Sequence, residues 1–353
     1  MPEKQYPSMN RPEVNSTAFT PRLLPTFPYV AQNVLYSLAQ LVVAAASLFL
    51  TVFLFIPLSL LRVMLPKRWL QPVGMTQQEA TEKNKRNRVV LVVGASRGIG
   101  FSVMKQYVNE PDTIIIAASR RMDHVRSAVA RLGKTPATIH CAEIDLNSPN
   151  KHIVDAIKQL DKQYGPITHL YEVSGLANNL DDSKDWDLDV VMDLVNVNVV
   201  GTITAVMTMY DLMKERRYGK ICVVGSTVGH FFPANTLTYS ATKSLVNSFT
   251  TGLRVLGTPV GVEVTSVQPG FIDTRMTDGM KREGSTAPKM GMGDPNGLAR
   301  TMKQAVEGGG VGVVCWPGSQ GMIMFALRAL NPICDDFGKW VSMKLGLAGR
   351  KIS

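Results

Sequence analysis

A glycine-rich turn between an apolar strand and a helix is the feature that most limits how this chain can fold. The turn has the pattern Gly94-x3-Gly98-x-Gly100 and directly follows the apolar run Val89–Val93. Its glycines permit a tight turn, close approach of the backbone to a pyrophosphate and close packing of the following helix. The free N–H groups at the helix N-terminus favour a phosphate there. The residues expected to form this cradle are Gly94, Ser96, Arg97, Gly98, Ile99 and Gly100.

Apolar strand patterns alternate with helical patterns from Arg88 onward, at the spacing of βαβ units. This alternation predicts a parallel sheet with helices on both faces, which is a doubly wound α/β (Rossmann) fold. The sheet is expected to have seven strands. They are Val89–Val93, Thr113–Ala118, Thr138–Glu143, His169–Val173, Lys220–Val224, Val262–Val267 and Gly312–Cys315.

A long uncharged stretch, residues 34–61, precedes the α/β region and is rich in Leu, Val, Ala and Phe. Spanning a bilayer takes roughly 20 apolar residues, so the stretch is long enough to be a membrane anchor. A helix over all of it would be about 42 Å long, more than a hydrocarbon core of about 30 Å, and Pro57 interrupts it. A tilted single span and a re-entrant hairpin in one leaflet are both compatible with this pattern.

The residues around the apolar stretch divide the rest of the chain. Residues 1–33 are rich in proline and predict a disordered tail, residues 62–87 a basic and polar linker, and residues 88–317 the α/β domain. Residues 318–353 predict an amphipathic helical extension, which either covers the core or lies on a membrane. Arg62, Lys67 and Arg68 follow the apolar stretch and only Arg22 precedes it closely. The positive-inside tendency therefore places the α/β domain in the cytosol.

The net charge of +10 is spread along the chain and is not gathered into one basic block. Nucleic-acid binding needs a basic patch with stacking aromatic residues, and no such patch stands out, so we expect no nucleic-acid partner. The four cysteines, Cys141, Cys222, Cys315 and Cys334, lack CxxC spacing. A disulfide framework or a zinc site is therefore not expected, and the thiols predict a reducing compartment.

The end of the second strand bears on which dinucleotide binds. An acid there would hold the ribose 2′-hydroxyl of NAD and repel a 2′-phosphate, but the chain has Ser119, Arg120 and Arg121. Guanidinium groups suit phosphate geometry, and Arg97 in the glycine turn favours the same ligand. NADP(H) is therefore the expected cofactor and NAD(H) the less favoured one. Asp145 and Leu146 follow the third strand, where they either meet the adenine ring or, for Asp145, cap a helix.

Tyr239 and Lys243 are one helical turn apart, and Ser226 follows the fifth strand. A free tyrosine titrates near pH 10, and a lysine ammonium within about 4–6 Å, together with a nicotinamide ring, would lower its pKa by roughly 1–3 units. Tyr239 would then exchange protons near neutral pH, and Ser226 would polarise the substrate oxygen. Beside a dinucleotide cradle, this set predicts hydride-transfer chemistry on a carbonyl or an alcohol.

With these motifs, residues 88 to about 317 resemble the single-domain type of the short-chain dehydrogenase/reductase family. The motif residues are Gly94-x3-Gly98-x-Gly100, Asp145, Asn198, Gly201, Ser226, Tyr239-x3-Lys243, Pro269, Gly270 and Thr274. The resemblance implies that Asn198 holds a water that connects Lys243 to solvent, and that Lys243 also bonds the nicotinamide ribose. It implies a homodimer or a homotetramer as well.

The same resemblance implies that the segment Pro269–Thr274, with Gly270, Ile272 and Thr274, lies along the nicotinamide. One departure concerns the end of the fourth strand, where the family usually has Asn-Asn-Ala-Gly. This chain has Glu172, Val173, Ser174 and Gly175 there, so the resemblance does not extend to the side-chain bonds that usually brace the sheet, while Gly175 keeps the backbone space beside the cofactor.

The substrate is expected to contact a loop that, by the resemblance, covers the site after Thr274. This loop holds Met276 and Met280, and methionines adapt to irregular apolar surfaces such as a lipid chain, although they also simply pack in a lid. His230 either faces the substrate or is an ordinary loop histidine. The run from Tyr239 to Lys243 is similar to that of membrane-bound reductases of 3-ketoacyl chains and steroids.

These observations predict a membrane-anchored, NADPH-dependent reductase of a lipid-like ketone or aldehyde, of the long-chain 3-keto lipid or steroid ketone class. The catalytic residues would be Asn198, Ser226, Tyr239 and Lys243. The endoplasmic reticulum is the expected location, with the lipid droplet as an alternative. The alternative functions are a steroid- or retinoid-type alcohol dehydrogenase working oxidatively, a catalytically silent NADP-binding scaffold and a nucleotide-sugar epimerase or dehydratase.

Overall fold

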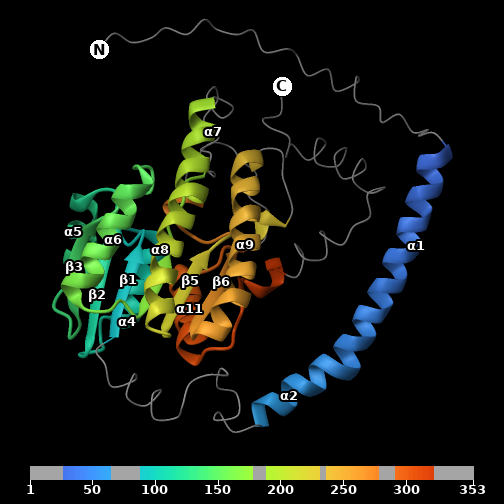
Figure 1. Cartoon of the computed structure of the whole chain (residues 1–353), viewed down its shortest axis with the longest axis horizontal. Coiled ribbons are helices and arrows are strands. Elements are labelled where there is room, and N and C mark those ends of the chain that lie inside the picture. The colour runs from blue at the N-terminus through green and yellow to red at the C-terminus, as the bar shows by residue number, and fades with distance from the viewer. Residues whose placement is uncertain (1–26, 65–87, 178–187, 231–235, 278–290, 322–353) are drawn as a thin grey trace, which may run out of the picture. The chain divides into compact units, whose positions relative to one another are not determined.

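The computed structural model describes residues 27–64, 88–177, 188–230, 236–277 and 291–321 of the chain. These residues fall into two compact units, a helical one that ends at Val63 and a larger α/β unit (Figure 1). Most of the predicted tail, linker and C-terminal extension lies outside the described residues, so those domain boundaries stay predictions.

The α/β unit is built on one sheet of seven parallel strands in the order β3-β2-β1-β4-β5-β6-β7. The strand order reverses between β1 and β4, as expected for a doubly wound fold. The predicted fold and the predicted strands are thereby confirmed. The strands are β1 (Arg88–Val93), β2 (Thr113–Ser119), β3 (Thr138–Glu143), β4 (His169–Glu172), β5 (Gly219–Val224), β6 (Val262–Pro269) and β7 (Val313–Trp316).

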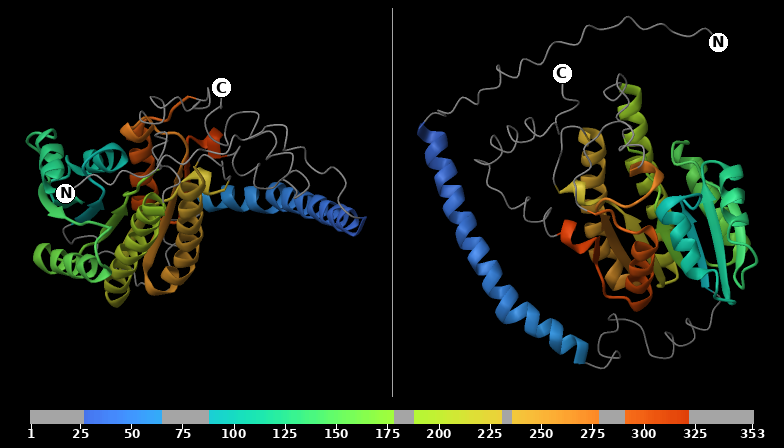
Figure 2. Two further views of the ribbon diagram at one scale, coloured as in Figure 1. Left: turned by 90° about the horizontal axis from the view of Figure 1, so that it is seen from above. Right: turned by 180° about the vertical axis from the view of Figure 1, so that it is seen from behind.

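Helices cover both faces of this sheet (Figures 1 and 2). One face packs against α4 (Gly98–Tyr107), α5 (Met122–Ala130) and α11 (Pro295–Gly308). The opposite face packs against α6 (Asn150–Tyr164), α8 (Thr202–Glu215) and α9 (Leu237–Gly257). The remaining helical elements are α7 (Leu188–Val195), η3 (Asn196–Gly201), η4 (Thr227–Gly229) and η6 (Thr258–Val260).

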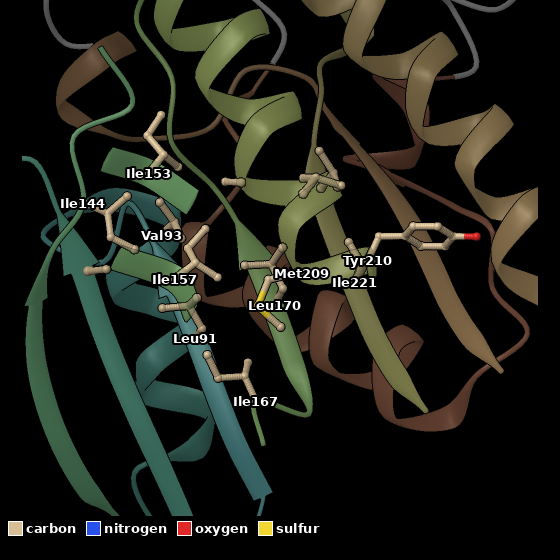
Figure 3. Packing of buried hydrophobic residues seen from close by; sticks show 14 of the residues in the cluster. Leu91, Val93, Ile144, Ile153, Ile157, Ile167, Leu170, Met209, Tyr210 and Ile221 are labelled. Atoms are coloured by element: carbon tan, nitrogen blue, oxygen red, sulfur yellow. The ribbon is translucent and has the colours of Figure 1, made fainter. Parts of the chain in front are cut away.

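The strands are apolar along their whole length because both of their faces are buried. In β1, Leu91 and Val93 face α6 and α8, whereas Val90 and Val92 face the opposite layer. Figure 3 shows the first of these cores, where Ile157 of α6 and Met209 of α8 meet Leu91 and Leu170. This packing fixes the strand ends that carry the site.

The helical unit is one run of helix, made of α1 (Phe27–Leu50), the π-helix η1 (Thr51–Phe55) and α2 (Ile56–Met64). It begins within residues 1–33, which the sequence assigned to the tail. The π-helical turn lies just before Pro57, whose missing N–H cannot complete the α-helical ladder. The backbone of this run does not reverse, unlike that of a hairpin.

Two helices in the described part of the chain are long and apolar enough to cross a membrane. In Val30–Leu58, the most apolar window of 18 residues has no buried residue, whereas in Leu188–Glu215 the corresponding window is 39% buried. The second helix is therefore accounted for by the core of the α/β unit, to which Ala205, Val206 and Met209 belong.

Candidate active site

The glycine turn lies at the carboxyl end of β1, beside the point where the strand order reverses. Gly94 and Gly98 have positive φ values of 93° and 55°, which other residues rarely adopt. A Cβ atom on Gly94 would lie 2.9 Å from the backbone nitrogen of Ser174, and one on Gly100 would lie 2.2 Å from the carbonyl oxygen of Gly94. Both glycines are therefore required by close packing.

The N-terminus of α4 faces the turn and starts without a side-chain cap, because Arg97 at the N-cap position makes no capping hydrogen bond. The first N–H groups of the helix thus lack a side-chain acceptor. Thr274 lies over this end of the helix, since a Cβ atom on Gly98 would be 3.4 Å from its Cγ2 atom. A helix N-terminus with free donors, glycines and a threonine fits the pyrophosphate of a dinucleotide.

Arginines lie at the glycine turn and at the end of β2, where the sequence predicts contact with the adenosine ribose. Arg97 and Arg120 are exposed, whereas Arg121 forms an ion pair with Asp123 at 2.8 Å. The sequence did not single out Arg131, yet its Nη2 atom donates to the carbonyl oxygen of Ser96 at 3.3 Å. This guanidinium also lies 4.4 Å from the ring centroid of Phe101, so it is held beside the turn.

Residues around Ser119 and Asp145 are held by local hydrogen bonds. Ser119 Oγ donates to the carbonyl oxygen of Arg121 at 3.3 Å. Asp145 Oδ1 accepts from the backbone nitrogen of Asn147 at 3.0 Å. This contact is a local turn and does not cap α6, whose N-cap is Pro149 without a side-chain hydrogen bond, so the adenine contact stays a prediction. Leu146 is buried, and its carbonyl oxygen would lie 2.2 Å from a Cβ atom on Gly201, which explains that glycine.

Ser226 follows β5, and its position is set by hydrogen bonds on both sides. Its Oγ atom donates to the carbonyl oxygen of Pro269 at 3.2 Å and accepts from the backbone nitrogen of Val228 at 3.3 Å. Asn247, from the third turn of α9, donates from Nδ2 to the carbonyl oxygen of Ser226 at 2.9 Å. The sequence reasoning missed Asn247 because it is 21 residues away from Ser226 in the chain.

Tyr239 and Lys243 lie on α9, with the Lys243 Nζ atom 5.9 Å from the Tyr239 ring centroid. Tyr239 is partly buried and hydrogen-bonds with the Ser226 side chain. Burial raises the pKa of Tyr239, and the bond with Ser226 lowers it by less. The sequence predicted a lowered pKa, so the protein alone does not produce that shift, because desolvation outweighs the hydrogen bond.

Lys243 is buried, with 4% of its surface exposed, and its Nζ atom donates to the carbonyl oxygen of Val224 at 2.9 Å. Desolvation lowers the pKa of Lys243 to about 8, while the charge of Glu172 acts in the opposite direction. A lysine that titrates near neutral pH is able to give up and regain a proton during turnover.

Asn198 lies in the π-helix η3, fully buried, between Lys243 and the segment after β4. Its amide is clamped, because Oδ1 accepts from the Leu176 nitrogen and Nδ2 donates to the Leu176 oxygen, both at 2.8 Å. Nδ2 also lies 3.1 Å from Thr242 Oγ1. Gly175 sits against this group, since its Cβ would be 3.3 Å from Lys243 Nζ. The implied water relay through Asn198 stays a prediction.

The segment after β6 closes over this end of the sheet. Ile272 is buried and forms a β-bridge with Gly293, and the backbone nitrogen of Thr274 donates to Thr277 Oγ1 at 3.0 Å. Gln320, which the sequence analysis did not single out, accepts from the Phe271 nitrogen at 2.7 Å. A Cβ atom on Gly270 would lie 2.0 Å from Gln320 Oε1, so the glycine makes room for this contact.

The predicted substrate residues have different environments. His230 is buried and its Nε2 atom lies 2.8 Å from Gln268 Oε1, so the ring bonds to β6. Met276 is 37% exposed. Met280 lies outside the described residues. The described chain therefore brings Ser226, Tyr239, Lys243, Asn198 and the glycine turn together, and it leaves the substrate contacts as predictions.

Taken together, the site has a hydroxyl that can polarise an oxygen, a phenol that can donate a proton and a buried ammonium group beside a dinucleotide cradle. Among the described residues, no group of three His, Cys, Asp or Glu side chains is arranged to hold a metal ion. The cysteines that the structure describes, Cys141, Cys222 and Cys315, are free thiols.

Known proteins resemble this chain in sequence and in fold. The short chain dehydrogenase family model matches residues 88–284. Carbonyl reductase family member 4 of Xenopus tropicalis is 29% identical over 222 residues, which cover 62% of this chain and 91% of that protein. The NADP-dependent 3-hydroxy acid dehydrogenase of Schizosaccharomyces pombe is 27% identical over 191 residues, covering 54% and 73%.

Solved structures show the same fold. A short-chain dehydrogenase from Streptomyces avermitilis aligns with a TM-score of 0.60 and 21% identity, covering 74% of this chain and 98% of that one. A short-chain dehydrogenase from Sphingobium yanoikuyae in complex with NADPH aligns with a TM-score of 0.58 and 19% identity, covering 68% and 93%. The family model covers more than half of the chain and includes the glycine turn, Ser226, Tyr239 and Lys243. The chain therefore belongs to the short-chain dehydrogenase family of oxidoreductases, which act on CH–OH and C=O groups.

Proposed function

We propose that the protein is a membrane-anchored, NADPH-dependent reductase of a lipid-like ketone or aldehyde. The observation that carries this proposal is the convergence of Ser226, Tyr239 and Lys243 beside the glycine turn. The turn, the uncapped N-terminus of α4 and Thr274 would hold the dinucleotide, which supplies a hydride for the carbonyl carbon when it is bound.

The side chains of the site would supply the other half of the reaction. Ser226 Oγ would donate a hydrogen bond to the substrate oxygen, where negative charge develops. Tyr239 Oη would give its proton to that oxygen, and the proton would be restored from Lys243, with Asn198 on the path to solvent. The reverse oxidation of an alcohol would use the same groups with the proton moving in the opposite direction.

The preference for NADP(H) rests on the arginines around β2 and the glycine turn. Arg97 and Arg120 are exposed, and Arg131 is held at Ser96, so three guanidinium groups are available to a 2′-phosphate. The described residues at the end of β2 include Ser119 but no acid in the position that would hold an NAD ribose. The relative from Schizosaccharomyces pombe is named as NADP-dependent, which agrees with this preference.

Membrane anchoring rests on the helical unit. Its apolar helical stretch Val30–Leu58 has 29 residues and would be about 44 Å long as a straight helix. A single tilted span accommodates that length better than a hairpin, because the run stays helical through Pro57. The flanking Arg62, Lys67 and Arg68 favour a cytosolic α/β unit, on the endoplasmic reticulum or a lipid droplet.

A lipid-like substrate would suit an enzyme that is anchored beside a two-dimensional pool of such molecules, and Met276 would border it. A homodimer or homotetramer is the proposed assembly, since members of this family generally form oligomers.

The deciding experiment follows cofactor oxidation by the detergent-solubilised full chain. NADPH and NADH are offered in turn with long-chain 3-ketoacyl thioesters, 3-ketosphinganine, steroid ketones and aliphatic aldehydes. We expect NADPH to be consumed with one lipid class and Tyr239→Phe to abolish that turnover. Cofactor binding without turnover of any ketone, aldehyde or corresponding alcohol would instead support the silent scaffold.

A further inference from the structure

Glu172 is a buried carboxyl group that the proposed reaction does not use. It is the last residue of β4, with 1% of its surface exposed. Its Oε1 atom accepts from the backbone nitrogen of Ser174 at 3.0 Å. Its Oε2 atom is buried and has no hydrogen-bond partner among the described residues. An unpartnered oxygen of a buried acid is costly, so its retention calls for a physical reason.

Among the described residues around Glu172, Lys243 is the charged group that acts on its carboxyl group. On the neighbouring strands it pairs with Val93 of β1 and Val223 of β5, both apolar. Lys243 itself lies on α9. Tyr239 is the next titratable group on that helix, and its ring centroid is 5.9 Å from Lys243 Nζ.

The segment that starts at Glu172 also encloses the lysine. A Cβ atom on Gly175 would lie 3.3 Å from Lys243 Nζ, and the backbone of Leu176 clamps Asn198. The carboxyl group therefore holds, through Ser174, the start of the segment that packs against the lysine. Glu172 acts on Lys243 in two ways, by its charge and by the backbone that it anchors.

The two buried groups titrate in the same pH range. Desolvation raises the pKa of Glu172 to about 8 and lowers the pKa of Lys243 to about 8, and each charge favours the ionised form of the other. In such a coupled pair, the pKa at which the first proton leaves as the pH rises belongs to the pair as a whole and not to Glu172 or Lys243 alone. Because the charge of Lys243 favours the ionised form of Glu172 and the charge of Glu172 favours the ionised form of Lys243, loss of the first proton favours the carboxylate–ammonium state.

We propose that Glu172 is a positioning residue for Lys243, whose ionised carboxylate keeps the lysine ammonium group protonated so that the site remains active at alkaline pH. This inference rests on the proposed function of Lys243 in returning a proton to Tyr239. It assigns a role to a residue that stands where the family pattern usually has asparagine, which cannot supply a charge.

The first test compares the pH dependence of kcat/KM for the full chain and Glu172→Gln. Glutamine keeps an oxygen for the Ser174 nitrogen but never ionises, so a merely structural role would leave the profile unchanged. We expect the alkaline limb of Glu172→Gln to move to lower pH by about one unit, while activity at acidic pH is retained. Tyr171→Phe, one residue earlier and on the opposite face of β4, is the matched control and should keep the wild-type limb. An unshifted limb in Glu172→Gln would overturn the proposal.

The second test needs no turnover and follows thermal unfolding of the cofactor-free protein from pH 5 to pH 8. The raised pKa of Glu172 means that the folded state binds more protons than the unfolded state in this window, so stability falls as pH rises. Glutamine removes this fall, so Glu172→Gln should match the wild type at pH 5 and unfold at a higher temperature at pH 8. Parallel curves would show that Glu172 does not titrate as inferred.

Lys243→Met tests whether the two groups are coupled. Without the ammonium group the carboxyl group should stay protonated to still higher pH, so the fall in stability should extend beyond pH 8. The same curve in Lys243→Met and the wild type would contradict the coupling. If no substrate is turned over, the proposed function fails while these unfolding curves still decide the inference. If Glu172→Gln does not fold, Glu172→Asp keeps a carboxylate, and loss of its alkaline limb would contradict the charge-based role.

Discussion

Two polar clusters lie on opposite sides of the sheet, and they differ in what burial does to their titratable groups. The catalytic cluster, Ser226, Tyr239 and Lys243, lies where α9 meets the carboxyl end of β5. The tyrosine cluster, Tyr107, His169, Tyr171 and Glu307, joins β4 to α4 and α11. In the tyrosine cluster the hydroxyl oxygens of Tyr107 and Tyr171 are 2.7 Å apart, and Tyr107 donates to Glu307 Oε1 at 2.9 Å.

Burial drives the groups of the tyrosine cluster away from neutral pH. It raises the pKa values of Tyr107 and Tyr171 well above their usual value and lowers that of His169 well below its own. These three side chains are therefore fixed in their uncharged forms. In the catalytic site, burial also raises the pKa of Tyr239, but it brings the pKa values of Lys243 and of the neighbouring Glu172 to about 8. Burial creates a reactive site only where it moves pKa values toward the working pH.

The largest expected effect is on kcat, and it should distinguish the two clusters when one phenol oxygen is removed from each in turn. Tyr239→Phe removes the proton donor and should lower kcat by roughly 10²–10⁴-fold, the usual contribution of a positioned acid. Tyr171→Phe removes a hydroxyl whose hydrogen bond in the described part of the chain is to Tyr107 of the tyrosine cluster, so kcat should be retained. Circular dichroism first confirms that both variants fold, and their steady-state kcat values are then compared with that of the wild type. Equal losses would mean that the clusters do not differ in function.

The next effect concerns stability and should appear in the tyrosine cluster without a change in kcat. Glu307→Ala removes the acceptor for Tyr107 and the partner of Arg88 at 3.4 Å. We expect a loss of about 1–3 kcal/mol in the free energy of unfolding, because the remaining groups are partly buried. Asp155→Ala on α6 is the matched control, since its pair with Lys151 is exposed and contributes about 0–1 kcal/mol. Urea titration measures both, and a fall in kcat for Glu307→Ala would show that the cluster reaches the active site.

The free energy of unfolding below about pH 6.5 should depend on His169 of the tyrosine cluster. The folded pKa of His169 lies below its unfolded value, so the unfolded state binds more protons and stability falls as pH decreases below about 6.5. The slope approaches about 1.4 kcal/mol per pH unit for one such group. His169→Gln should therefore lose less stability than the wild type between pH 6.5 and pH 5. Unfolding midpoints across this range test the difference, and equal slopes would contradict it.

The sequence predicted those features of the fold and of the active site that depend on residues close together in the chain. Strand patterns, the spacing Gly94-x3-Gly98-x-Gly100 and the helical offset between Tyr239 and Lys243 each depend on residues within a few positions. The contacts that hold the site could not be read in this way, because they join distant positions. Asn247 supports Ser226 across 21 residues and Gln320 supports Phe271 across 49.

The pKa of Tyr239 shows a second limit of sequence reasoning. Its spacing to Lys243 predicted a lowered value with a nicotinamide bound, whereas the protein's own groups raise it, because desolvation depends on how completely the surrounding elements cover the phenol. The raised pKa of Glu172 likewise depends on burial in the folded protein. Its identity is visible in the sequence, whereas its burial and the effect of the Lys243 charge on it follow from how β4 is covered in the folded sheet.

The smallest expected effect is on the preference for NADPH over NADH, and it comes from a residue outside both clusters. Arg120 is exposed at the end of β2, so Arg120→Ala should remove one charge-assisted contact to a 2′-phosphate. We expect the ratio of kcat/KM for NADPH over NADH to fall by about tenfold, which corresponds to about 1.4 kcal/mol, while kcat with saturating NADPH is retained. Arg121→Ala is the control, because Arg121 is already paired with Asp123 and should contribute less. A larger change in Arg121→Ala than in Arg120→Ala would place the phosphate at the other guanidinium group and require that Asp123 release it.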